Sequence, residues 1–181
     1  METKFGIKIA VVGAESTGKT SLCEALAKHF HAALVPEYAR TYFQKADINH
    51  YQINDLEIIA KKQIELENEQ LNLRNALLIC DTNLITIKIW AELEFNACPN
   101  SILALKKQNK YDFYLITSND LPWEKDPLRQ NKFNRDLIFD RNLEEVKAEN
   151  CPYAIVSGYN AGRIQNAIQS LCAFLKNKTK N

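Results

Sequence analysis

Residues 13–20 constrain the fold of this chain more than any other segment. They read Gly-Ala-Glu-Ser-Thr-Gly-Lys-Thr and match the pattern G-x-x-x-x-G-K-[ST] at every constrained position. Glycines at two positions of such a loop let backbone N–H groups approach phosphate oxygens without an intervening Cβ. Lys19 would place its charge against the β- and γ-phosphates, and the Thr20 hydroxyl would bind Mg²⁺. The pattern therefore predicts a phosphate-binding loop.

The residues around this loop support that interpretation. Residues 8–12 read Lys-Ile-Ala-Val-Val, an apolar run typical of a central parallel strand. Downstream, apolar side chains recur at helical spacing, at Leu22, Ala25, Leu26 and Phe30. Strand, loop and helix occur in the required order, which disfavours a glycine-rich turn that binds nothing. We expect the phosphates of ATP to contact Gly13, Glu15, Ser16, Thr17, Gly18, Lys19, Thr20 and Ser21.

The rest of the chain alternates short apolar runs with helical segments, which predicts an α/β fold. Further strands are expected at residues 33–35, 77–81, 111–117 and 153–156. Further helices are expected at residues 54–76, 83–94, 100–107, 136–149 and near the C-terminus. Five parallel strands joined by right-handed crossovers and flanked by helices fit the P-loop NTPase architecture of nucleoside and nucleotide kinases. We expect one such domain over residues 1–181.

Composition narrows the possible partners and surroundings. The formal net charge is +1, so no global field favours nucleic acid or an anionic membrane. No apolar stretch approaches the length of a membrane span, and we expect no signal peptide and a cytoplasmic location. The five cysteines form no C-x-x-C pair and are expected to be reduced, with Cys23, Cys80 and Cys172 in the core. An oligomer is compatible with the sequence but not implied by it.

Polar residues follow the expected strand at residues 33–35, near the edge where ligands bind in open α/β sheets. They read Glu37-Tyr38-Ala39-Arg40. Glu37 could accept a proton from a hydroxyl group, and Arg40 could neutralise a phosphate or orient Glu37. Alternatively, Glu37 begins a helix and complements its dipole. We favour the functional interpretation because phosphoryl acceptors bind at such strand ends.

A second polar group, Asp81-Thr82-Asn83, follows the expected strand at residues 77–81. A carboxylate after four apolar strand residues has the form of a Walker B aspartate, which holds Mg²⁺ directly or through water. The alternative is a buried aspartate that caps a helix. The phosphate loop expected on a neighbouring strand favours the metal role for Asp81.

Residues 118–135 form a third, irregular segment that carries two prolines, one tryptophan and two arginines. Phosphoryl transfer develops negative charge and has to exclude water, so kinases often close an arginine-bearing lid over the phosphates. Arg129 and Arg135 are the candidates for that role. Trp123 could stack on a substrate or anchor the lid to the core.

Taken together, these motifs resemble the ribosylnicotinamide kinase domain of bacterial NAD-biosynthesis regulators and its stand-alone AAA-like relatives. The resemblance runs in order over nearly the whole chain and includes P-E-Y-A-R at 36–40 and L-P-W…D-P-L-R at 121–129. It implies ATP-dependent phosphorylation of nicotinamide riboside to the mononucleotide. It also implies a nucleoside site near Glu37, Tyr38 and Arg40, with Asp81 near Mg²⁺ and the acceptor hydroxyl. Further substrate contacts are expected from Asn83 and Trp123.

Two positions depart from the regulator kinases. Pro36 stands where those kinases have a tryptophan that stacks on the nicotinamide ring, and Asn83 replaces the second aspartate of D-T-D. Proline offers no comparable stacking face to a cationic ring. These departures motivate an alternative, an ATP-binding regulator whose hydrolysis switches a protein partner. The main hypothesis is a nucleoside kinase in which either Glu37 or Asp81 acts on the hydroxyl, with Lys19, Arg129 and Arg135 stabilising the transferred charge.

Overall fold

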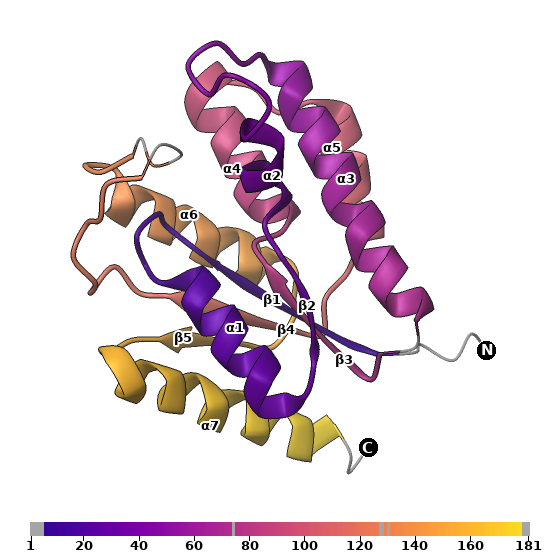
Figure 1. Cartoon of the computed structure of the whole chain (residues 1–181), viewed down its shortest axis with the longest axis vertical. Helices are drawn as coiled ribbons and strands as arrows, with labels where there is room; N and C mark the ends of the chain where they lie inside the picture. Colours follow the sequence, from indigo (N-terminus) through magenta and orange to yellow (C-terminus); the bar gives the residue numbers. More distant parts are fainter. Residues whose placement is uncertain (1–5, 74, 127–128, 130, 179–181) are drawn as a thin grey trace.

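A five-stranded sheet forms the centre of the computed structural model, which describes residues 6–73, 75–126, 129 and 131–178. The strands are β1 (Ile7–Gly13), β2 (Ala33–Val35), β3 (Leu77–Asp81), β4 (Phe113–Thr117) and β5 (Tyr153–Val156). Their order is β2-β3-β1-β4-β5, and every neighbouring pair is parallel (Figure 1). The expected five-stranded parallel sheet is therefore confirmed.

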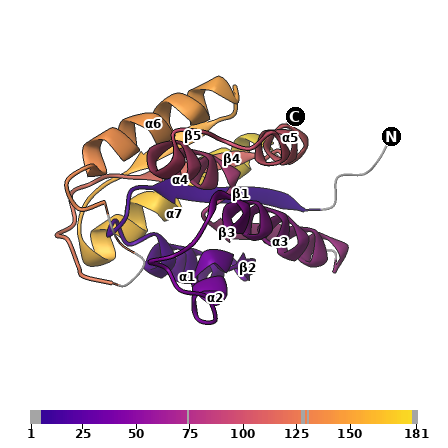
Figure 2. The ribbon, with the colours of Figure 1, turned by 90° about the horizontal axis from the view of Figure 1, so that it is seen from above.

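Helices cover both faces of this sheet. They are α1 (Lys19–Phe30), α2 (Tyr38–Phe43), α3 (Ile53–Asn72), α4 (Leu84–Phe95), α5 (Asn100–Gln108), α6 (Arg135–Ala148) and α7 (Asn160–Lys178). Helices α1 and α7 pack on one face, and α4 and α6 pack on the other. The helices α2, α3 and α5 gather around the outer side of α4 in a third apolar cluster (Figures 1 and 2).

The central strand β1 shows why its sequence has no polar–apolar alternation. Ile9 and Val11 pack against α1 and α7, whereas Ala10 and Val12 pack against α4 and α6. Both faces of β1 are buried, so both sets of side chains are apolar. Because β1 lies between β3 and β4, its end at Gly13 comes close to the polar residues that end those two strands.

Several element boundaries differ from the sequence expectation. The helix expected at residues 54–76 ends at Asn72, and β4 begins at Phe113 after two residues expected to belong to it. Helix α2 is a further short element with Glu37 at its N-cap position, so the alternative interpretation of Glu37 as the start of a helix is correct. Cys23 and Cys80 are buried as expected, but Cys172 is only half-buried because it lies beside the apolar stripe of α7. No helix in the described residues is both long and apolar enough to cross a membrane.

Candidate functional site

The loop after β1 has a backbone shape that requires glycine at two positions. Gly13 has a φ of +142°, and a Cβ there would lie 2.3 Å from Thr117 Oγ1 and 2.9 Å from the Thr117 carbonyl oxygen. Gly18 has a φ of +73° and directly precedes α1. The Thr17 hydroxyl donates to the Ala14 carbonyl at 2.8 Å and so fixes the loop from within. The loop thus turns tightly against β4, as expected for a phosphate cradle.

Lys19 places a cation over this loop. Its Nζ donates hydrogen bonds to the carbonyl oxygens of Gly13 at 3.1 Å and Ala14 at 2.8 Å. The side chain lines a cavity of about 550 Å³ that opens around the loop. Both contacts are to neutral carbonyl groups, so the ammonium charge is available to an anion bound in the cavity.

Thr20 and Asp81 form a polar pair at the start of α1 and the end of β3. The Thr20 hydroxyl donates to Asp81 Oδ2 at 2.6 Å. Asp81 is only 2% exposed, and its Oδ1 has no hydrogen-bond partner among the described residues. Burial raises the pKa of the Asp81 carboxyl, and the hydrogen bond from Thr20 offsets part of that rise. An orphaned carboxylate oxygen beside a hydroxyl is a suitable donor set for a hard cation.

The charge and number of these donors fit Mg²⁺ better than a metal held by protein alone. The described part of the chain contains no group of three or more His, Cys, Asp or Glu residues that could hold a metal. Mg²⁺ typically takes only one or two protein ligands and fills its remaining positions with substrate phosphates and water. Thr20 and Asp81, next to a phosphate cradle, meet that requirement.

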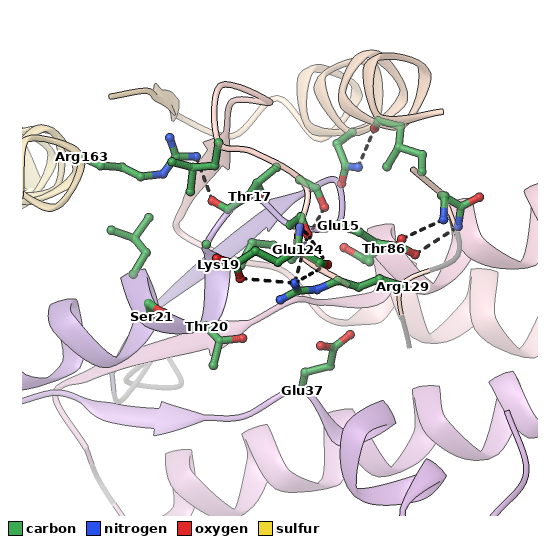
Figure 3. Close-up of a pocket in the computed structure, with 18 of the residues that line it drawn as sticks. Glu15, Thr17, Lys19, Thr20, Ser21, Glu37, Thr86, Glu124, Arg129 and Arg163 are labelled. Atoms are coloured by element: carbon green, nitrogen blue, oxygen red, sulfur yellow. Dashed lines mark hydrogen bonds and ion pairs between the residues drawn. The ribbon is translucent and has the colours of Figure 1, made fainter. Parts of the chain in front are cut away.

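Glu37 lines the same cavity as Lys19 and the phosphate loop (Figure 3). Its side chain is 23% exposed, and burial raises its pKa, although the charge of Lys19 opposes the rise. Arg40 lies one helical turn later, with its Nε 3.3 Å from Glu37 Oε2. The same guanidinium donates to Asp126 at 3.2 Å. A carboxylate of raised pKa therefore shares one cavity with the phosphate loop and is oriented by a cation.

The irregular segment that follows β4 lies directly on the phosphate loop. Arg129 donates to the Ser16 hydroxyl at 3.0 Å and to the Glu124 carbonyl oxygen at 2.9 Å. Arg135 donates to the Ser16 carbonyl oxygen at 3.2 Å. Asn131 binds the Glu15 carboxylate through its backbone N–H and its side-chain amide, at 2.9 and 3.1 Å. Both expected lid arginines thus reach the loop, whereas Pro127 and Leu128 of the motif lie outside the described residues.

Four residues expected to contact a substrate are not among the described residues that line the cavity, namely Tyr38, Asp81, Asn83 and Trp123. Tyr38 packs with Tyr42 in the aromatic cluster beside α4. Asn83 is buried and caps α4, its Oδ1 accepting a hydrogen bond from the Ile85 N–H at 2.9 Å. Trp123 is half-buried within the lid segment. Of the residues expected to contact a substrate, Glu37 and Arg40 are the two that line the cavity among the described residues.

Arg163 at the start of α7 belongs to the site, and sequence analysis missed it. The residue is 4% exposed, and its guanidinium donates to the carbonyl oxygens of Thr17 at 2.9 Å and Ser118 at 3.0 Å. It also pairs with Asp120 at 2.6 Å. Arg163 therefore ties the phosphate loop to the start of the lid (Figure 3). The available signal was an arginine on the otherwise apolar stripe of α7, four residues before Ala167.

A family model described as an AAA domain matches residues 8–163. The chain belongs to this AAA domain family. The AAA domain is 24% identical over 158 residues to the trifunctional NAD biosynthesis/regulator protein NadR of Escherichia coli K12. That match covers 80% of the chain but only 38% of NadR, so the chain spans well under half the length of this relative.

Solved structures resemble the AAA domain over most of its length. The crystal structure of NadR in complex with NR superposes with a TM-score of 0.77 at 18% identity, covering 94% of this chain and 51% of that one. The thymidylate kinase of Ehrlichia chaffeensis gives a TM-score of 0.67 at 13% identity and is itself covered to 98%. These matches confirm the P-loop kinase fold, and the NadR matches confirm the resemblance expected from the motifs.

Proposed function

We propose that this protein is a Mg·ATP-dependent kinase that phosphorylates the 5′-hydroxyl of a nucleoside, with nicotinamide riboside as the favoured acceptor. The observation that carries the proposal is that Glu37 lines the same cavity as the phosphate loop. A phosphate loop alone supports nucleotide binding. A carboxylate of raised pKa in the same cavity supports transfer to a hydroxyl group, because it can accept the proton that the hydroxyl loses.

The phosphate end of the cavity gives each residue of the loop a role. The loop amides and Lys19 would hold the β- and γ-phosphates of ATP, and Thr20 and Asp81 would hold Mg²⁺. When bound, Mg²⁺ neutralises negative charge on those phosphates. Arg129 and Arg135, which already contact Ser16, would stabilise the charge that develops on the transferred group.

The placement of the two carboxylates supports separate roles for them. Asp81 is engaged with the Thr20 hydroxyl, which favours a metal ligand. Glu37 lines the open cavity and is held by Arg40, which favours the base. In the proposed step the acceptor oxygen bonds to the γ-phosphorus while the bond from that phosphorus to the β-bridging oxygen breaks. The hydroxyl proton passes to Glu37, and ADP leaves.

The comparisons support a nucleoside-type acceptor. A solved NadR structure holds NR, and a thymidylate kinase shares the fold over nearly its whole length. Asn83 is the residue that supports the alternative function, an ATP-binding regulator of a protein partner. Its side chain caps α4 and adds no second carboxylate beside Asp81. A rate of ATP hydrolysis that no added nucleoside changes would favour that alternative.

A panel of nucleosides that includes nicotinamide riboside tests the proposal with purified protein, Mg²⁺ and ATP. We expect ADP to form only with the right nucleoside, and Lys19→Ala to abolish this activity. Lys61→Ala is the matched control, because Lys61 is an exposed lysine of α3 far along the chain from the loop. ADP formation that is equal with and without every nucleoside would overturn the proposal.

A further inference from the structure

The wall of the cavity formed by α4 and α6 differs in character from the phosphate end. Helix α4 contributes a stripe at helical spacing, and α6 contributes two residues one turn apart. These six residues are Thr86, Ile89, Trp90, Leu93, Ile138 and Asn142. The wall is mostly apolar with a few polar atoms, which is the usual composition of a pocket for a flat organic group.

Asn142 is the fully buried polar residue of this wall. The residue is 0% exposed, and its Nδ2 donates to the Ile138 carbonyl oxygen at 2.7 Å. A backbone carbonyl can only accept, so the amide orientation is fixed, with nitrogen toward its own helix and oxygen away from it. Asn142 Oδ1 has no hydrogen-bond partner in the described part of the chain. Buried acceptors in folded proteins are nearly always paired, so this oxygen calls for a donor.

Thr86 on the facing helix supplies a second polar atom. Its hydroxyl is also buried and has no hydrogen-bond partner among the described residues. In Figure 3 Thr86 lies on the far side of Lys19 from Arg163. An acceptor oxygen on α6 and a hydroxyl on α4 together match a group that both donates and accepts hydrogen bonds, such as a carboxamide.

Trp90 supplies an aromatic wall one turn after Thr86. Its Nε1 donates to the Tyr51 hydroxyl at 2.7 Å, and its ring packs edge-to-face against Tyr51 and tilted against Phe43. These contacts hold the polar edge of the indole in the aromatic cluster while Trp90 still lines the cavity. An indole is the best side chain for attracting a cationic ring. Pro36 offers no such surface.

We propose that Trp90 and Asn142 form the subsite for the base of the acceptor, and that Asn142 selects a base bearing a neutral N–H donor, such as a carboxamide, over the same base bearing a carboxylate. The inference rests on the proposed function and deepens it. A carboxamide can donate to Asn142 Oδ1 and accept from Thr86. A carboxylate has no proton to donate and would bring a negative charge against a buried carbonyl oxygen.

The test compares two ribosides that differ only in this group, nicotinamide riboside and nicotinic acid riboside. We expect kcat/KM of the wild type to favour the carboxamide by at least about tenfold. Asn142→Leu keeps the approximate side-chain volume and removes the acceptor, so the preference should fall toward unity through loss on the carboxamide. Asn68→Leu is the matched control on the exposed side of α3 and should keep the wild-type ratio.

The possible outcomes distinguish a failure of the subsite proposal from a failure of the proposed kinase function. Equal kcat/KM of the wild type on both ribosides, or an unchanged ratio in folded Asn142→Leu, overturns the subsite and leaves the kinase proposal standing. Phosphorylation of no nucleoside by the wild type overturns both. Should Asn142→Leu fail to fold, the wild-type ratio decides, together with Thr86→Val, which keeps the side-chain shape and removes a hydroxyl from which both ribosides can accept. We expect this variant to lower kcat/KM on both ribosides, and unchanged kcat/KM on both overturns the subsite.

Discussion

The Thr20 hydroxyl donates a hydrogen bond of 2.6 Å to Asp81 Oδ2, joining the first turn of α1 to the last residue of β3. The two residues are brought together by the sheet, because Asp81 stands beside Val11 in the parallel register of β1 and β3. The remaining oxygen of Asp81 has no partner among the described residues. A hydroxyl beside a carboxylate is a donor set that suits a divalent cation, and this supports the proposed Mg²⁺ site.

Replacing Thr20 tests that role directly. Thr20→Val removes the hydroxyl with little change in shape, and we expect the apparent affinity for Mg²⁺ in the presence of ATP to fall about 10–100-fold. Thr20→Ser keeps the hydroxyl and should stay close to the wild type. Calorimetric titration of nucleotide at several Mg²⁺ concentrations measures the effect. Equal Mg²⁺ dependence in the valine and serine variants would remove Thr20 from the metal site.

Arg129 offers a test of the lid. Its guanidinium lies on Ser16 of the phosphate loop, where it could reach the transferred group. We expect Arg129→Ala to lower kcat about 100-fold or more, with a smaller change in KM for ATP. Lys125→Ala, an exposed neighbour in the same segment, is the control and should behave as the wild type. A loss of equal size in both variants would indicate that the lid fold, rather than the guanidinium, had been damaged.

The pH dependence of the reaction tests Glu37. Burial raises the pKa of this carboxyl, so the group becomes protonated at a higher pH than an ordinary glutamate. A base has to be ionised, and kcat/KM should therefore fall as the pH drops through that raised pKa. Glu37→Gln should be slow at every pH and should lack this limb of the profile. An unchanged limb in Glu37→Gln would assign the base to another group.

Ionisation of Glu37, which the proposed activity requires, should lower the stability of the folded protein. Because its pKa is raised on folding, the folded state binds the Glu37 proton more tightly than the unfolded state does. The Glu37 contribution to the free energy of unfolding therefore falls as the pH rises from the unfolded pKa to the folded pKa. At neutral pH we expect Glu37→Gln to melt at a higher temperature than the wild type, despite its lost activity. Glu69→Gln, on the exposed face of α3, is the control and should leave the melting temperature unchanged.

Two glycines provide a matched test of the loop geometry. Gly13→Ala would place a Cβ 2.3 Å from Thr117 Oγ1 in a left-handed backbone conformation, and should cost about 2–4 kcal/mol of unfolding free energy. Gly162 lies in α7 with nothing within 4 Å of an added Cβ. Gly162→Ala should therefore stabilise the protein by about 0.5–1 kcal/mol. Chemical denaturation measures both values, and similar effects at the two positions would contradict the loop geometry.

The sheet and the phosphate loop could be predicted because local residues determine them. The motif at residues 13–20 fixes a loop between a strand and a helix, and the unbroken apolar run of β1 indicates a strand buried on both faces. The short helix α2 was expected only as an alternative, a helix that begins at Glu37, because no periodic pattern predicts its extent. It has only six residues, and packing against α3 and α4 stabilises it more than its own sequence does.

Distant contacts of the site were also beyond sequence reasoning. Arg163 lies 146 residues after Thr17, and no local pattern shows that the two meet. Asn142 lies in the helix expected at residues 136–149, and no local pattern shows that this polar side chain is fully buried. Asp81 could be placed beside the loop from the strand order expected of this architecture. Its pairing with Thr20 follows from that order and from the motif together.

The central claim is that phosphate moves from ATP to a nucleoside, and following the γ-phosphate tests it most directly. The protein is incubated with Mg²⁺, nicotinamide riboside and ATP labelled in the γ-phosphate, and the products are identified by mass spectrometry. The account predicts labelled mononucleotide formed in equal amount to ADP. Label found only in inorganic phosphate, with this riboside and with every other nucleoside offered, would contradict it.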